Sequence, residues 1–175
     1  MKRSDHAGRH VSPTNINKRL TIEYLADHRE FITTVAHWLH DEWGYLRPNE
    51  AGDDRVARVE RACGHRQIPT TLVAVDGDEP VGCASLIEHD MLTRPELSPW
   101  LAGVFVPREH RRCGIGAALV ERVVAEARSL GVPRLYLYTP GTGALYLRLG
   151  WSVVERTFYR ELWGETEVTI MEFGP

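Results

Sequence analysis

The sequence predicts one α+β domain, built around a mixed and mostly antiparallel sheet with a central β-α-β unit. Three observations indicate this fold: a hairpin pattern in the first half of the chain, a long amphipathic helix between two apolar strand-like runs, and two final strand-like segments. The 175 residues fit a single domain of ordinary size. We expect that domain to span residues 20–175.

The first elements are a strand and two helices. Leu20–Tyr24 alternates apolar and polar side chains, which is typical of a short strand. Asp27 is the expected N-cap of the first helix, whose apolar stripe ends at Trp43. The Gly44–Pro48 segment breaks this helix, and a second, charge-rich helix is expected over Asp53–Cys63.

A hairpin is predicted over Thr71–Ile87. Two apolar runs flank Asp76-Gly77-Asp78-Glu79, and this composition favours a tight hairpin loop. Two antiparallel strands should result.

The clearest helical pattern lies between two strand patterns. Its apolar stripe recurs every four residues and comprises Ile115, Leu119, Val123 and Ala127. Gly131 and Pro133 supply the stop. Leu101–Val106 precedes the helix and Leu135–Thr139 follows it, so these two strands should lie parallel.

The chain should close with a short helix and two strands. The helix covers Ala144–Leu149 and ends at Gly150, and the strands cover Ser152–Tyr159 and Thr166–Phe173. The predicted order is therefore β-α-α-β-β-β-α-β-α-β-β.

Composition excludes several classes of protein. Hydrophobic residues make up 43% and charged residues 26%, which is typical of a globular chain. The net charge of −3 argues against a general nucleic-acid binder, and no apolar run is long enough to cross a bilayer. We therefore expect neither nucleic acid nor membrane as a partner. Residues 1–19 are basic and polar without the apolar core of a signal peptide, and we interpret them as a flexible leader.

The cysteines and histidines indicate neither a disulfide framework nor a metal site. Cys63, Cys83 and Cys113 are odd in number, and their spacing fits no zinc motif, which favours a reducing cytoplasm. His37 and His40 lack the His-Glu-x-x-His pattern, so we interpret them as surface histidines and expect no metal.

The segment before the long helix has the features of an anion site. Gly114 and Gly116 allow a ligand to approach backbone N–H groups that have no partner inside the helix. The helix dipole adds partial positive charge, and Arg111 and Arg112 are close in sequence. These residues predict a site for a phosphate or diphosphate group.

Two common phosphate-binding motifs do not fit this segment. A Walker loop ends in Gly-Lys-Ser/Thr, which is absent. A dinucleotide fingerprint requires a third glycine where Leu119 stands, and the following strand ends in Thr139-Pro140 rather than in an acidic residue.

The chain resembles the GNAT family of N-acetyltransferases. Arg111-Arg112-Cys113-Gly114-Ile115-Gly116 matches the Gln/Arg-x-x-Gly-x-Gly/Ala loop of that family. Ala144-Leu145-Tyr146-Leu147-Arg148-Leu149-Gly150-Trp151 is similar to its second signature, a tyrosine-bearing helix followed by Gly-aromatic. The predicted element order also agrees, so the resemblance covers about Leu20 to Phe173 and implies helices on both faces of the sheet.

The resemblance implies acetyl-coenzyme A as cosubstrate, in a cleft between the two parallel strands. Backbone groups of Val104, Phe105 and Val106 would bind the pantetheine arm. The diphosphate would be held by Arg111, Arg112, Cys113, Gly114, Ile115, Gly116 and Ala117. The acceptor would be walled by Trp43, Tyr45, Tyr138 and Trp163.

The resemblance also assigns the catalytic acid. Tyr146 would protonate the departing thiolate of the coenzyme. Many relatives carry a glutamate base on the strand before the diphosphate loop, but Trp100–Val106 contains no acidic residue. Glu88, His89 and Asp90 are the nearest candidates, and we take Glu88 as the predicted base, acting through water.

We therefore expect an N-acetyltransferase that transfers the acetyl group directly to a primary amine on a small molecule or a peptide N-terminus. The missing glutamate favours an amine of low pKa, because an α-amine near about 8 needs less help to lose its proton than a lysine amine near about 10.4. The alternative is a non-catalytic module that binds acyl-coenzyme A as a sensor or structural ligand. Both a monomer and a homodimer are compatible with the sequence.

Overall fold

A computed structural model describes residues 20–46, 51–161 and 164–174 of the chain. Its strands are β1 Leu20–Tyr24, β2 Thr70–Asp76, β3 Glu79–Ile87, β4 Trp100–Phe105, β5 Leu135–Pro140, β6 Ser152–Glu161 and β7 Gly164–Phe173. Its helices are α1 Ile32–Trp43, α2 Gly52–Arg61, α3 Ile115–Ser129 and α4 Ala144–Arg148, with short 3-10 helices η2 Leu25–Asp27, η3 Arg29–Phe31, η4 Gly44–Leu46 and η5 Arg108–His110. The predicted leader and Trp163 lie outside the described residues.

The described strands form one mixed sheet in the order β1-β2-β3-β4-β5-β7-β6. Neighbouring strands are antiparallel except β4 and β5, which are parallel and are connected through α3. The predicted α+β class, the hairpin and the central β-α-β unit are therefore confirmed.

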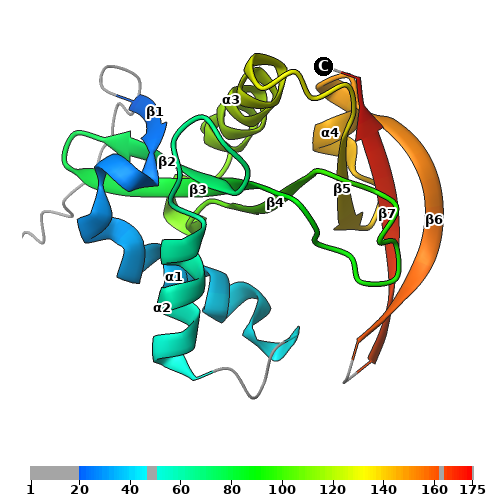
Figure 1. Cartoon of the computed structure of the whole chain (residues 1–175), viewed down its shortest axis with the longest axis horizontal. Coiled ribbons are helices and arrows are strands. Elements are labelled where there is room, and N and C mark those ends of the chain that lie inside the picture. Colours follow the sequence, from blue (N-terminus) through cyan, green and yellow to red (C-terminus); the bar gives the residue numbers. More distant parts are fainter. Residues whose placement is uncertain (1–19, 47–50, 162–163, 175) are drawn as a thin grey trace, which may run out of the picture.

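Helices cover both faces of the first half of the sheet, with α3 on one face and α1 and α2 on the other (Figure 1). Side chains of β2 alternate between these layers: Leu72 packs with α3, whereas Val73 packs with α1 and α2. A strand buried on both faces has no polar side, which explains why β2 and β3 have nearly continuous apolar sequences.

A buried polar network attaches α3 to the edge of the sheet. The Tyr24 hydroxyl on β1 lies 2.9 and 2.8 Å from the two carboxylate oxygens of Glu126, which is only 3% exposed. Arg122 donates to the same carboxylate at 2.9 Å. Tyr24 and Arg122 together compensate the buried charge of Glu126. These bonds fix the orientation of α3 relative to the strands.

The two parallel strands meet at one residue pair and then separate. Trp100 is opposite Tyr136, and the Tyr136 N–H donates to the Pro99 carbonyl at 3.0 Å. Beyond this pair, the described parts of β4 and β5 have no ladder contact, and the strands turn apart in Figure 1. The edge of β4 that faces β5 therefore carries unpaired backbone groups.

A bulge bends β4 in the same region. Cys83 and Ser85 of β3 are opposite Phe105 and Ala102, so β4 has one extra residue between the paired positions. Gly103 lies inside this bulge with φ +58°. The left-handed backbone there suits glycine, and the bulge increases the divergence from β5.

The start of the first helix was predicted wrongly. Asp27 lies in η2, and its Oδ1 is 2.8 Å from His65 Nε2 instead of bonding to helix amides. The α-helix starts at Ile32, after a second 3-10 turn, and has no side-chain cap. A helix N-cap requires extended backbone before the first turn, whereas Asp27 is already part of a turn.

The cysteines form no disulfide among the described residues. Cys63, Cys83 and Cys113 all carry free thiols, and burial raises the pKa of the Cys83 thiol to about 12. No helix among the described residues is long and apolar enough to span a membrane.

Candidate active site

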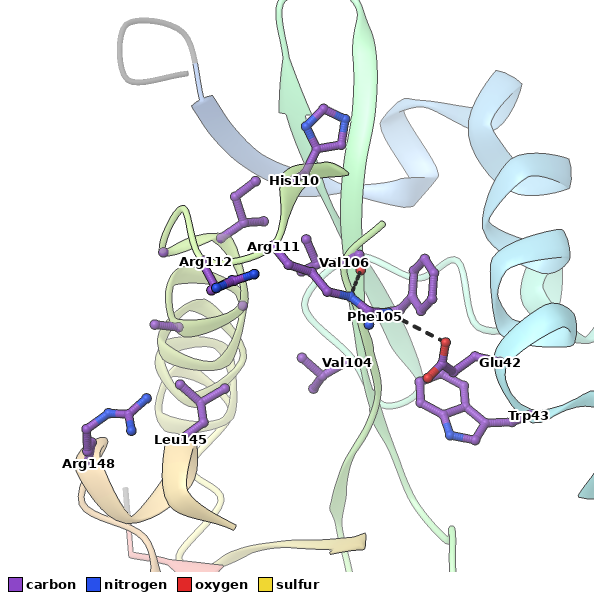
Figure 2. A pocket seen from close by; sticks show the side chains of 14 residues that line it. Glu42, Trp43, Val104, Phe105, Val106, His110, Arg111, Arg112, Leu145 and Arg148 are labelled. Atoms are coloured by element: carbon purple, nitrogen blue, oxygen red, sulfur yellow. Dashed lines mark hydrogen bonds and ion pairs between the residues drawn. The ribbon is translucent and has the colours of Figure 1, made fainter. Parts of the chain in front are cut away.

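A pocket of about 540 Å³ opens at the carboxyl end of β4. It lies between the end of α1, the start of α3 and the side of α4, as Figure 2 shows. The residues that line it are Glu42, Trp43, Val104, Phe105, Val106, His110, Arg111, Arg112, Gly114, Ile115, Gly116, Ala117, Leu145 and Arg148. Its volume is in the range of small-molecule sites, and its place beyond the carboxyl end of a parallel strand is typical of ligand clefts.

The start of α3 presents backbone donors to this pocket. The first helical bond runs from the Ala118 N–H to the Gly114 carbonyl at 3.0 Å. Among the described residues, no acceptor is bonded to the N–H groups of Arg112–Ala117. Gly114, with φ +84°, turns the chain into the helix. Free amides and the positive end of the helix dipole together form an anion-binding surface.

Arginine side chains add positive charge around these amides. Arg112 and Arg148 line the pocket and are exposed. Arg111 is held in place: its Nε donates to the Val106 carbonyl at 2.8 Å, and its guanidinium carbon lies 5.8 Å from the centre of the Phe105 ring. Its Nη2 lies 3.6 Å from a carboxylate oxygen of Glu42. Arg111 therefore bridges the end of β4 and the end of α1.

Tyr146 lies on α4 and is not among the described residues that line the pocket. Its ring packs edge-on against Trp151, with ring centres 6.0 Å apart. Burial raises the pKa of the Tyr146 hydroxyl above its ordinary value, which keeps it protonated at neutral pH. This hydroxyl makes no hydrogen bond to the part of the chain that the structure describes. Leu145 and Arg148 of the same helix do line the pocket.

The structure places the other predicted residues as follows. Trp43 lines the pocket, with its ring nearly perpendicular to Phe105 at 6.3 Å. Tyr45 is 61% exposed in η4, and Tyr138 packs against Trp100 on the sheet face opposite α3. Five predicted residues that the structure describes are absent from the pocket lining: Tyr45 and Tyr138; Glu88, exposed after β3; Cys113, exposed before α3; and Tyr146.

Four lining residues were not predicted from the sequence as site residues: Glu42, His110, Leu145 and Arg148. His110, Leu145 and Arg148 stand inside or beside the two segments that carry the family resemblance, so a search along those segments could have found them. Glu42 carries no such signal, because it comes from α1 and reaches the pocket only through tertiary packing.

Comparison with known proteins assigns the family. The sequence profile of the acetyltransferase (GNAT) family matches residues 32–151. The chain belongs to this family. The matched span runs from the first residue of α1 to the Trp151 that follows α4, so every described residue that lines the pocket belongs to the GNAT region.

Solved structures share the GNAT fold. YncA from Salmonella typhimurium, solved with acetyl-CoA, is 20% identical with a TM-score of 0.68, over 90% of this chain and 94% of that one. An aminoglycoside 6'-N-acetyltransferase in complex with coenzyme A is 20% identical with a TM-score of 0.67, over 88% and 96%. An N-acetyltransferase from Staphylococcus aureus is 14% identical with a TM-score of 0.70, over 90% and 99%. No curated protein matches the sequence.

Proposed function

We propose that this acetyltransferase takes its acetyl group from acetyl-coenzyme A and transfers it directly to a primary amine, on a small molecule or a peptide N-terminus. The observation that carries the proposal is the run of amides from Arg112 to Ala117 that bond to no described residue, at the start of α3 and beside the separated edge of β4. Such a run suits a diphosphate, and an unpaired strand edge suits an extended amide-bearing chain.

The protein offers a suitable surface for each of two parts of the coenzyme, the diphosphate and the pantetheine arm. The amides of Arg112–Ala117 would hold the diphosphate, with Arg111, Arg112 and Arg148 as charge partners. Backbone groups of Val104–Val106, on the β4 edge that β5 leaves unpaired, would bond to the amides of the pantetheine arm. Cys113, Gly114, Ile115, Gly116 and Ala117 contribute through their backbone.

The transfer is a single displacement at the thioester carbonyl. The amine nitrogen forms a bond to the carbonyl carbon, the carbon–sulfur bond breaks, and the sulfur leaves with the electron pair. Tyr146 would give its phenolic proton to this sulfur, which its raised pKa and protonated state allow. Tyr146 is absent from the described lining of the pocket, so this role requires its hydroxyl to reach the sulfur once the coenzyme is bound.

The amine must lose one proton in this reaction. Glu88 stands as the predicted base, exposed at the end of β3 and acting through water. With no carboxylate on β4, an acceptor of low pKa such as an α-amine reacts most readily, because a larger fraction of it is neutral at physiological pH. Trp43, Tyr45, Tyr138 and Trp163 are the proposed walls of the acceptor site.

The test is release of coenzyme A thiol from acetyl-coenzyme A, measured over a panel of amines with mass detection of products. The panel should include peptide N-termini, small α-amines and an aminoglycoside, since one neighbour of similar fold is named for that class. We expect amine-dependent release and an N-acetyl product. Tight binding of coenzyme A by calorimetry without release for any amine would contradict acetyl transfer and favour a non-catalytic acyl-coenzyme A module.

A further inference from the structure

Charged side chains of both signs line the pocket. Arg112 and Arg148 lie on the α3 and α4 side, whereas Glu42 comes from α1 on the other side of β4 (Figure 2). Among the described residues that line the pocket, Glu42 is the one with an acidic side chain. Arg112 and Arg148 suit an anionic coenzyme. The Glu42 carboxylate suits a cation, and the Arg111 guanidinium 3.6 Å away offsets only part of its charge.

The Glu42 carboxylate has free capacity to accept hydrogen bonds. Its contact with Arg111 is an ion pair of 3.6 Å, which is too long for a good hydrogen bond. Glu42 makes no hydrogen bond to any residue in the described ranges. An ionised carboxylate has about four acceptor sites, so a ligand donor can bind here while Arg111 stays bonded to Val106.

An aromatic ring stands beside this carboxylate. Trp43 follows Glu42 in α1, lines the same pocket, and is held edge-on by Phe105. The face of an indole ring attracts cations. We call Glu42 and Trp43 together the cation subsite.

The cation subsite lies at the wide end of the cleft, away from the point where the strands meet. Leu39 of α1 lies against Gly103, and Trp43, one turn later, lies against Phe105. The strands pair at Trp100, six residues and about 20 Å of strand before Val106. In the proposed function the pantetheine arm extends from α3 toward that junction, so the thioester lies deeper in the cleft than the cation subsite.

A group bound at the cation subsite is therefore distinct from the amine that reacts. We propose that the acceptor carries a cationic group several bonds away from an α-amine, and that Glu42 and Trp43 bind this group. The matching class is amino-acid or peptide amines with an arginine-like side chain. This inference rests on the proposed amine acetylation and makes Glu42 a specificity-determining residue of that reaction.

Arginine amide and citrulline amide test whether Glu42 and Trp43 bind a cationic group of the acceptor. The two amides share the α-amine and nearly the same shape but differ in side-chain charge. With acetyl-coenzyme A saturating, kcat/KM for wild-type protein should favour arginine amide by roughly tenfold, as expected for one partly exposed charge pair. Glu42→Gln should reduce the ratio to about twofold or less. Asp41→Asn is the matched control, since Asp41 is exposed on the same helix but is not part of the described lining, and it should keep the preference.

Binding separates this inference from the proposed function. Arginine amide titrated into the complex with coenzyme A should bind roughly tenfold more weakly to Glu42→Gln, and that result supports the cation subsite even if neither amide is acetylated. Equal rates with both amides in wild-type protein, or no binding and no acetylation of arginine amide, would overturn it. The inference would also be overturned if Glu42→Gln lost coenzyme A affinity and lowered kcat/KM equally for both amides. Glu42 would then act only by holding Arg111.

Discussion

At the scale of single residues, the proposed general acid Tyr146 makes no hydrogen bond to the part of the chain that the structure describes. The ring is fixed by Trp151 and the surrounding core, and burial keeps the phenol protonated by raising its pKa. The hydroxyl bonds to no described residue, so its removal should cost little stability, and it is available to bond to a ligand.

Tyr146→Phe should therefore lower turnover by roughly 10- to 100-fold, at the low end for general acids because a thiolate is already a good leaving group. Coenzyme A affinity should change by less than about twofold, and the free energy of unfolding by less than about 1 kcal/mol. Steady-state thiol release, calorimetric binding of coenzyme A and thermal unfolding measure the three quantities. Unchanged turnover would remove Tyr146 from the mechanism.

At the scale of elements, the start of α3 contains a glycine, Gly116, that ligand binding would require but the fold does not. A Cβ atom placed at Gly116 would meet only Leu145 Cδ2 and Val106 Cγ2, both at 3.9 Å, which is ordinary contact. The fold thus does not require a glycine at this helical position. A ligand that approaches the amides closely would require one.

We predict that Gly116→Ala lowers coenzyme A affinity by roughly tenfold or more. The free energy of unfolding should stay equal or rise by up to about 1 kcal/mol, because alanine favours the helix more than glycine does. Calorimetric binding and denaturant unfolding provide the measurements. Gly114→Ala is the contrasting control: with φ +84° it should cost about 1 kcal/mol or more of stability through backbone strain. If Gly116→Ala binds coenzyme A like the wild type, the diphosphate does not lie on these amides.

Elements specified by local pattern were predictable, and those specified by tertiary contacts were not. The helix over α3 and the hairpin of β2 and β3 follow from periodicity and turn composition, and both were predicted within a few residues. The 3-10 turns before α1 were missed because Asp27 is held by His65, which lies far along the chain. The bulge at Gly103 was not predicted, although an isolated glycine inside a strand pattern is a signal for one.

The same distinction applies to the site. The glycines and arginines before α3 were recognisable as candidate site residues because they lie in one continuous segment. Glu42 was not, since its role depends on how α1 crosses β4 and on the position of Arg111. Tyr146 was predicted from its segment and remains a prediction, because the residue is absent from the described lining of the pocket.

At the scale of the whole molecule, the sheet is weakest along the cleft. One residue pair joins β4 to β5, so the strands on either side are connected mainly by α3 and by the core beneath it. That core includes Leu72 and Leu86 from one side and Leu137 and Met171 from the other. Continuous packing across the divide should make the two halves unfold together.

Coenzyme A should therefore stabilise the entire described fold, because it would occupy the space between the two halves. At a free concentration of 100 times its Kd, binding to the native state alone adds about 2.7 kcal/mol to the free energy of unfolding. For a domain of this size that corresponds to a rise in Tm of roughly 5 to 10 °C, in one cooperative transition. Scanning calorimetry with and without coenzyme A measures this shift, and Gly116→Ala at the same coenzyme concentration should show a smaller one. Two separate transitions, with only one of them moved by coenzyme A, would mean that the halves are not coupled through α3 and its core.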